Sequence, residues 1–186
     1  VVDLKTGDPI GSGGNDYLFT TSDNAVISSP VALDKGLNFE VNAVYFGEAI
    51  INDPTAPYSG WTGKVWSFDT YLNWDGVNPD LDKDPEYWQV TNNPTLWHHH
   101  LLLETFQPDP PDPQIKLGPI TAPMALTIDW YDNVWVYFGT GRYVSNPDKT
   151  DVAQQHLFGI KDPLYQASRD YTSPDYLASP SQNIAA

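Results

Sequence analysis

The residues whose types and spacing first suggest chemistry form an acidic run near the middle of the chain. Residues 80–86 carry a carboxylate at every second position, at Asp80, Asp82, Asp84 and Glu86. A curled loop with this spacing can converge four carboxylates on one cation, and oxygen ligands are those that calcium prefers. The EF-hand pattern, however, needs glycine at its sixth position and glutamate at its twelfth, where this run has Pro85 and Thr91. A solvated acidic loop is therefore the alternative to a calcium site here.

Two further patterns suggest chemistry, and both are incomplete. The run His98-His99-His100 suggests zinc, but neighbours on a strand point to opposite faces, so only His98 and His100 share a face. Two histidines are fewer than the three or four protein ligands of a zinc site. Gly139-Thr140-Gly141 lacks the third glycine and the helix of a phosphate loop, and no Gly-x-Ser-x-Gly occurs. The sequence therefore gives no support to a nucleotide site or to serine hydrolysis.

The composition narrows the possible partners. The chain has 186 residues, 40% of them hydrophobic, with 17 prolines, 13 glycines, no cysteine and a net charge of −15. A polyanion is repelled by nucleic acid and by anionic lipid, so we expect neither as a main partner. No apolar run approaches the roughly 20 residues of a membrane helix, so no membrane span is expected. Because the chain starts at Val1 without a methionine, we interpret it as a processed product or a fragment of a longer protein.

The sequence contains an internal repeat, and the repeated segments are the elements that must position these groups. The stretch 42–47 resembles 133–139, with an aromatic and β-branched run ended by glycine in both. Residues 29–33 and 122–126 precede the two copies, and residues 65–69 and 157–162 follow them, at offsets of 92 or 93 residues. Matching segments at one offset predict an internal structural repeat.

The repeat predicts an all-β fold. Short aromatic and β-branched runs between turn residues predict strands over 17–21, 26–33, 43–46, 63–69, 97–106, 120–128, 134–138 and 155–160. Grouped by the repeat, they form four-stranded antiparallel units, which are typical of β-propeller blades of the quinoprotein type. The chain holds about two to three such blades, which cannot close a ring. Their open edges would invite pairing with other chains, so we expect the rest of the propeller or a partner to cover them.

The predicted domain boundaries follow from this grouping. Residues 1–165 form a partial β-propeller, in which 1–21 end one blade, 26–106 make a complete blade with an inserted loop at 70–96, and 120–162 make a further blade. Residues 166–186 form an extended or mobile C-terminal tail.

The aromatic residues fall into two groups. Trp66, Phe68, Trp135 and Tyr137 lie in predicted strands and are expected to pack between blades. A second group lies in predicted loops, where it either marks a contact surface or anchors the loops: Trp61, Trp74, Trp88 and Trp130.

The repeat segments resemble the C-terminal propeller of the PilY1 family, the large tip-associated proteins of type IV pili. The resemblance is carried by residues 29–31, 43–47, 63–69, 119–123, 136–143 and 155–162. The run Phe138-Gly139-Thr140-Gly141-Arg142-Tyr143, followed by an acidic loop and a Gly-Ile-x-Asp strand, is the more specific part. The Gly-Lys-x-Trp-x-Phe-Asp strand also occurs in quinoprotein dehydrogenases and other propellers.

The resemblance implies a protein that is not an enzyme, with a function in pilus biogenesis, control of retraction and surface adhesion that is exerted by binding. It implies an extracellular or cell-surface location, at the pilus tip or outer membrane. The partners it implies are minor pilins or the remainder of the same propeller, and a host or abiotic surface.

The resemblance also implies a calcium loop between the strands that end near Leu33 and begin near Ala43. The ligands would be Asp34, Asn38 and Asn42, with Glu40 contributing its backbone carbonyl. This chain has Gly36 where the family has an aspartate or asparagine. With one carboxylate among the matched side chains, any calcium binding is expected to be weak. An ordinary polar turn is the alternative.

Two other functions remain open from the sequence. One is a quinoprotein dehydrogenase propeller using pyrroloquinoline quinone, which would need a closed ring, an axial calcium and a tryptophan beneath the quinone. The other is a carbohydrate- or surface-binding propeller.

Overall fold

The computed structural model describes the parts of the chain that build two packed β-sheets. The described residues are 11–12, 15–16, 22–35, 37, 39, 41–53, 60–70, 98–107, 113–131, 133–144, 146–150 and 152–162. The predicted strand at 17–21, almost all of the predicted insertion at 70–96 and the predicted tail at 166–186 lie outside these residues.

The first sheet is antiparallel and is centred on a long hairpin. Its strands are β3 (Ala25–Ile27), β4 (Val31–Leu33), β5 (Ala43–Ile51), β6 (Trp61–Asp69) and β7 (His98–Leu103). Strands β3 and β4 pair with the two ends of β5, so the prediction of one continuous strand over 26–33 is wrong. Between them, the Ser28 hydroxyl accepts a hydrogen bond from the Gly47 amide at 2.9 Å, and Pro30 has no amide hydrogen to offer a ladder.

The second sheet has three antiparallel strands in sequence order. They are β10 (Ala125–Ile128), β11 (Val134–Gly139) and β12 (Leu157–Lys161). The predicted strand at 120–128 begins later than expected, because Ile120 instead makes an isolated parallel bridge to Gly141. The remaining elements are small: β1 (Gly11–Ser12) with β2 (Asn15–Asp16), β8 (Thr105–Phe106) with β9 (Ile115–Lys116), and the short 3-10 helix η3 (Asn146–Thr150).

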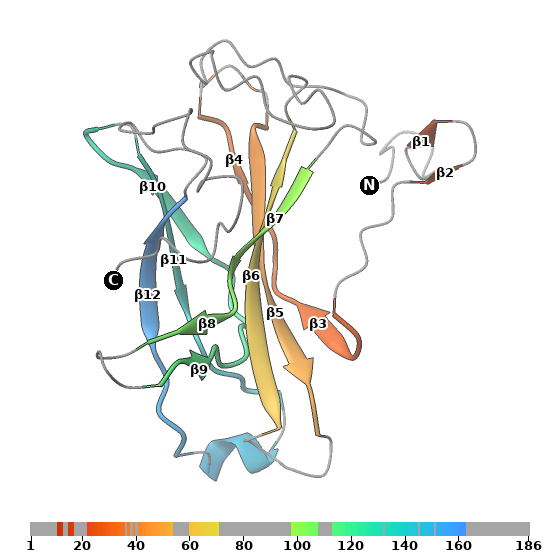
Figure 1. The fold of residues 1–186 in the computed structure, drawn as a ribbon, viewed down its shortest axis with the longest axis vertical. Coiled ribbons are helices and arrows are strands. Elements are labelled where there is room, and N and C mark those ends of the chain that lie inside the picture. Colours follow the sequence, from red (N-terminus) through yellow and green to blue (C-terminus); the bar gives the residue numbers. More distant parts are fainter. Residues whose placement is uncertain are drawn as a thin grey trace.

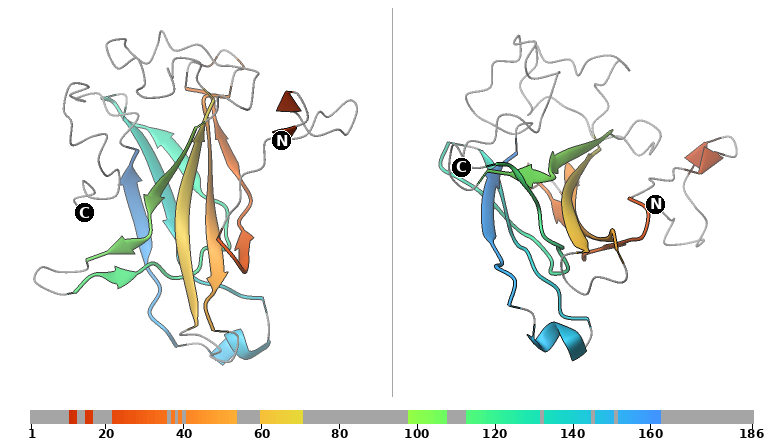
Figure 2. Two further views of the ribbon diagram at one scale, coloured as in Figure 1. Left: turned by 45° about the vertical axis from the view of Figure 1, so that its right-hand side comes forward. Right: turned by 60° about the horizontal axis from the view of Figure 1, so that its bottom comes forward.

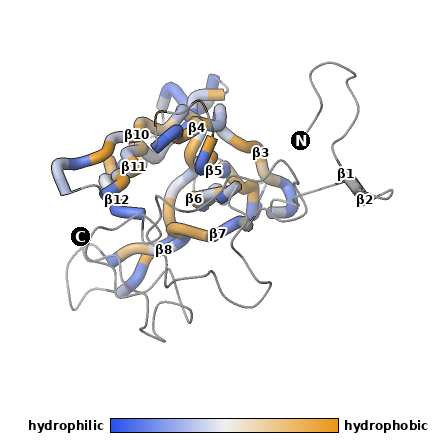
Figure 3. Tube along the Cα trace, turned by 90° about the horizontal axis from the view of Figure 1, so that it is seen from above, coloured by the Kyte–Doolittle hydropathy of each residue, from blue (hydrophilic) through white to orange (hydrophobic). Residues whose placement is uncertain are grey.

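The main core lies between the two sheets. Figures 1 and 2 show the second sheet beside the first, with the strands of both running along the long axis of the molecule. Tyr45 and Val65 enter this core from the first sheet, and Val136, Phe138 and Ile160 enter it from the second. Viewed from above, hydrophobic residues recur in the strands of both sheets (Figure 3). The all-β prediction is therefore confirmed.

Strand β6 shows why these residues form a sheet with two distinct faces. Val65 and Ser67 are fully buried, whereas Lys64, Trp66 and Phe68, which alternate with them along the strand, are partly exposed. This alternation is the one expected from the period of two in a strand. Trp66 and Phe68 lie on the face of β6 that is opposite to Val65, away from the second sheet. Their expected packing between blades therefore stays a prediction.

The β5–β6 and β11–β12 ladders give these strands of the repeat an offset of 92 residues. The preceding strand has an offset of 94 residues, because Val31 pairs with Tyr45 whereas Ala125 pairs with Tyr137. Tyr45 pairs with Ser67 as Tyr137 pairs with Gly159, and Ala43 pairs with Asp69 as Trp135 pairs with Lys161. The structural partner of Asp69 in the repeat is therefore Lys161. Aligning Asp69 with Asp162, as the strand-ending aspartates suggest, is wrong by one residue.

Phe138 supports a stability prediction, because its side chain is almost fully buried in the contact between the sheets. We expect Phe138→Ala to lower the free energy of unfolding by about 3–5 kcal/mol, through lost burial and the cavity left behind. Urea denaturation measures this, and Leu157→Ala at a largely exposed position of β12 is the matched control. A loss below about 1 kcal/mol for Phe138→Ala would contradict its place in the core.

Candidate functional site

The loop of the predicted calcium site connects β4 to β5, and the structure describes part of it. The Asp34 carboxylate accepts a hydrogen bond from the Phe39 amide at 2.8 Å, and the Asn42 side-chain oxygen accepts one from the Lys35 amide at 2.5 Å. Leu37 and Phe39 have φ of 52° and 67°, in the left-handed region, which curls the loop. Asn38 and Glu40 lie outside the described residues.

The described ligands alone do not make a metal site. Within the described residues, no group of three or more His, Cys, Asp or Glu side chains lies together. Asp34 and Asn42 supply one carboxylate and one amide oxygen, and both already accept an amide hydrogen. Calcium needs six to eight oxygens. Calcium in this loop therefore stays a prediction, as does calcium at Asp80, Asp82, Asp84 and Glu86, which lie outside the described residues.

The histidine run is placed on β7 as the sequence predicts. In the strand register His98 lies opposite Asp69 and His100 lies opposite Ser67. His100 Nε2 lies 3.0 Å from the Asp69 carboxylate. His99 is on the other face beside the Trp66 and Phe68 rings, where burial, and secondly the nearby His100, lowers its pKa.

The connection between β10 and β11 is built on Asp129. One carboxylate oxygen accepts hydrogen bonds from the Tyr131 amide at 2.8 Å and the Asn133 amide at 3.0 Å. The other accepts one from the Trp135 indole at 2.9 Å and one from the Asn133 side chain at 2.8 Å. The Trp135 bond, followed by those from Asn133, holds the pKa of the Asp129 carboxyl well below its usual value. These bonds therefore fix the loop from within.

Two aromatic side chains of the turn that Asp129 fixes point into solvent. Trp130 is 97% exposed and Tyr131 is 73% exposed. Large aromatics held in the open by a rigid turn are typical of contact surfaces, because Trp and Tyr supply most binding energy at interfaces. The sequence marks Trp130 as a possible contact residue. It does not single out Asp129, although an aspartate that starts a turn and bonds to following amides is a recognisable pattern.

The two loops lie at the same end of the molecule. In Figure 1 the connection after β4 and the connection between β10 and β11 both lie beyond the upper ends of the strands. We call residues 34–42 and 129–133 the loop end. Leu37 and Phe39 are also strongly exposed there. The loop end thus contains four exposed apolar side chains and the predicted calcium ligands.

The Gly-Thr-Gly-Arg-Tyr run after β11 forms a corner. Gly141 has φ of 131°, its amide donates to the Pro119 carbonyl at 2.7 Å, and its carbonyl accepts from the Thr121 hydroxyl at 3.0 Å. The positive φ explains the glycine. The run therefore makes a turn, as its sequence predicts.

Arg142 joins this corner to helix η3 and to the first sheet. Its guanidinium lies 2.9 Å from a carboxylate oxygen of Asp148, and both side chains are nearly buried. The same guanidinium stacks 4.2 Å above the Trp61 ring. Trp61 therefore packs against the corner. It is the first residue of β6, so the prediction that it lies in a loop is wrong.

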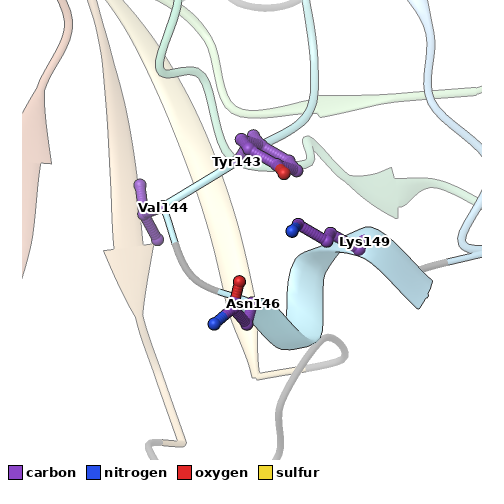
Figure 4. A pocket seen from close by; sticks show the side chains of 4 residues that line it. All are labelled: Tyr143, Val144, Asn146 and Lys149. Atoms are coloured by element: carbon purple, nitrogen blue, oxygen red, sulfur yellow. The ribbon is translucent and has the colours of Figure 1, made fainter.

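A shallow depression of about 380 Å³ lies next to the corner (Figure 4). Tyr143, Val144, Asn146 and Lys149 line it, and all four side chains are exposed. It offers an aromatic ring, an amide and one ammonium group. This chemistry suits weak recognition of a polar ligand.

One of three comparisons with known proteins finds a structure of similar fold. No protein-family model matches the chain, and no curated protein matches it. The crystal structure of the Pseudomonas aeruginosa PilY1 C-terminal domain does match, with a TM-score of 0.55, 20% sequence identity and 93% of this chain covered. This likeness confirms an all-β, propeller-like fold. The chain spans about a third (32%) of the length of that PilY1 chain. Among the described residues, no helix has the length and apolar character needed to cross a membrane.

The hydrogen bonds to the Asp129 carboxylate predict a pH dependence of stability. The pKa of Asp129 is lower in the folded chain than in the unfolded one, so its ionised form stabilises the fold above the unfolded pKa of about 4. This contribution is lost as pH falls below that value toward the folded pKa. We expect Asp129→Ala to lower the denaturation midpoint at pH 7, and the difference from wild type to shrink between pH 5 and pH 3. Trp130→Ala, beside Asp129 but not bonded to its carboxylate, is the control. A wild-type advantage that stays constant over this range would contradict the assignment.

Proposed function

We propose that this chain is part of a pilus-associated protein of the PilY1 kind, and that it acts by binding rather than by catalysis in type IV pilus biogenesis and surface adhesion. The observation that supports this most is the structural match to the PilY1 C-terminal domain over nearly the whole chain. The segments that carry the sequence resemblance are those that build the fold. They include β5, β6, β11, β12 and the corner after β11.

The loop end is the surface that we assign to this binding. Trp130 and Tyr131 are held in the open by Asp129, and Leu37 and Phe39 lie at the same end. The partners proposed are minor pilins and a host or abiotic surface, at the pilus tip or outer membrane. A carbohydrate ligand is the second candidate, because exposed Trp and Tyr rings also suit contact with sugars.

The polar groups of the core support binding over catalysis. The Tyr45 hydroxyl donates to Asp162 at 2.6 Å, and Asp69 lies against His100. These groups join strands to one another inside the fold. A quinoprotein dehydrogenase is the competing activity. Dye reduction on addition of pyrroloquinoline quinone and an alcohol would contradict our proposal.

The double variant Trp130→Ala/Tyr131→Ala tests the loop end. We expect it to weaken association with minor pilins by roughly tenfold or more, since exposed aromatics of this kind carry much of the binding energy at interfaces. Surface-based binding assays with the complete protein measure this. Val152→Ala, at another strongly exposed position, should bind like wild type. Equal binding by the double variant and wild type, with unchanged melting, would remove the loop end as the contact surface.

Calcium modulation of the loop end is a separate proposal with its own test. If calcium binds residues 34–42, chelation with EDTA should lower the melting temperature of wild type, because a ligand that binds only the folded state stabilises it. Asp34→Ala should melt like chelated wild type and should not respond to calcium. Magnesium at equal concentration is the control, since it prefers stricter geometry. Identical melts of wild type with calcium and with EDTA would rule out this site.

A further inference from the structure

The corner after β11 and helix η3 border a depression at the end of the molecule opposite to the loop end. Figure 1 shows η3 beyond the lower ends of the strands, whereas the loop end lies beyond their upper ends. The depression has a volume of about 380 Å³, and Tyr143, Val144, Asn146 and Lys149 line it. Ligand pockets in proteins measure roughly 300–1,000 Å³, so this volume suits a small ligand or one unit of a longer one.

A buried ion pair next to the depression fixes its shape. Asp148 is buried, and one of its carboxylate oxygens lies 2.9 Å from the Arg142 guanidinium. The other oxygen accepts a hydrogen bond from the Val144 amide at 2.9 Å. Asp148 therefore joins η3 to the segment that leads into it, and Arg142 stacks on Trp61 of β6. Because the fold already holds this frame, a ligand meets a largely preformed surface, which reduces the ordering cost of binding.

Three polar side chains at the depression are not used by the fold. In the described part of the chain, the side chains of Tyr143, Asn146 and Lys149 make no hydrogen bond or ion pair. Lys64 and Arg142, by contrast, each have a carboxylate partner. In Figure 4 the ammonium of Lys149 points away from η3, toward the space between Tyr143 and Asn146. These polar groups are therefore available to a ligand.

The lining groups specify the chemistry of such a ligand. An exposed tyrosine offers an apolar ring with a polar tip, and a side-chain amide both donates and accepts hydrogen bonds. One ammonium group balances one negative charge, which is the charge of a carboxylate. A phosphate monoester carries close to two charges and favours the forked donors of arginine. A ligand with one carboxylate, neighbouring hydroxyl groups and an apolar C–H face therefore fits best.

We propose that the depression binds a uronic acid unit of an acidic polysaccharide. The ring of Tyr143 packs on the apolar C–H face of the sugar. The ammonium of Lys149 pairs with the carboxylate, and the amide of Asn146 bonds to a hydroxyl group. Because the depression is shallow and its lining side chains are exposed, the polysaccharide can continue from the bound unit on either side.

This site is independent of the function proposed for the loop end. It shares no residue with the ranges 34–42 and 129–133. The chain carries a net charge of −15, so the protein repels an acidic ligand at a distance. Only a few exposed contacts offset this repulsion, and we expect a dissociation constant of about 1–10 mM for one sugar unit. Firm attachment would then need many sites engaged at once, as on a polysaccharide-coated surface.

Two sugars that differ only at C6 test the carboxylate contact. Ligand-observed NMR titrations of the complete protein measure the affinity for methyl β-D-glucuronide and for methyl β-D-glucoside, which has a hydroxymethyl group in place of the carboxylate. We expect wild type to prefer the glucuronide by about threefold or more, and Lys149→Met to lose this preference, since an exposed ion pair contributes modestly. Lys116→Met, at an exposed lysine of β9, is the matched control and should keep it. An unchanged preference in Lys149→Met, or no glucuronide binding by wild type at about 50 mM, would overturn the proposal.

A second variant separates this site from the loop end and from other ligands. Tyr143→Ala should weaken glucuronide binding by about fivefold or more through loss of the ring contact, with an unchanged melting temperature, because Tyr143 is 67% exposed. Trp130→Ala/Tyr131→Ala should bind the glucuronide like wild type. Loss of binding in that loop-end variant alone would overturn the proposal, in favour of a sugar site at the loop end. Displacement of the glucuronide by N-acetyl-glutamate N-methylamide at equal concentration would overturn it in favour of an acidic peptide.

Discussion

The structure depends on a polar contact in the middle of its apolar core. Asp162 is fully buried at the end of β12, where a lone carboxylate would be costly to hold. Its carboxylate accepts the hydroxyl of Tyr45 at 2.6 Å, and its amide donates to the carbonyl of Val134 at 2.9 Å. The first bond joins the two sheets and the second ends the β11–β12 ladder. A slip of β5 or β12 by one residue within its own sheet would turn Tyr45 or Asp162 to the wrong face, so this contact favours one strand register in each sheet.

The sequence predicts much of the fold because its strongest signals are local. The repeat, the central strands near 43–46 and 134–138 and the alternation of Val65 and Ser67 follow from short-range pattern. The register of the repeat does not follow from short-range pattern, because Asp69 and Asp162 each lie at the end of a strand and look equivalent. Only the ladders show that Lys161 takes the place of Asp69. The side-chain hydrogen bond of Ser28 that divides β3 from β4 is likewise a contact with a residue far along the chain.

The candidate site was less predictable than the fold, for a related reason. Trp130 could be named from its type, but its exposure depends on Asp129, whose bonds to Asn133 and Trp135 span a few residues and need the hairpin to exist. The calcium ligands come from a family resemblance and not from the geometry of Asp34 and Asn42. The corner at Gly141 was predictable because its glycine and turn are local. Its buried Arg142–Asp148 pair was not.

The charges of the described residues bear on how the loop end binds. The chain carries a net charge of −15, and several of its few cations are engaged within the fold. Arg142 pairs with Asp148, Lys64 lies 3.8 Å from Glu104, and Lys161 lies over Trp135. A partner therefore meets an acidic protein whose strongly exposed loop-end side chains, among the described residues, are Leu37, Phe39, Trp130 and Tyr131. Long-range repulsion from an anionic partner weakens as salt screens it, whereas apolar contact does not weaken in this way. The binding that we propose for the loop end should then tolerate, and even favour, high ionic strength, which is the opposite of binding through a basic patch.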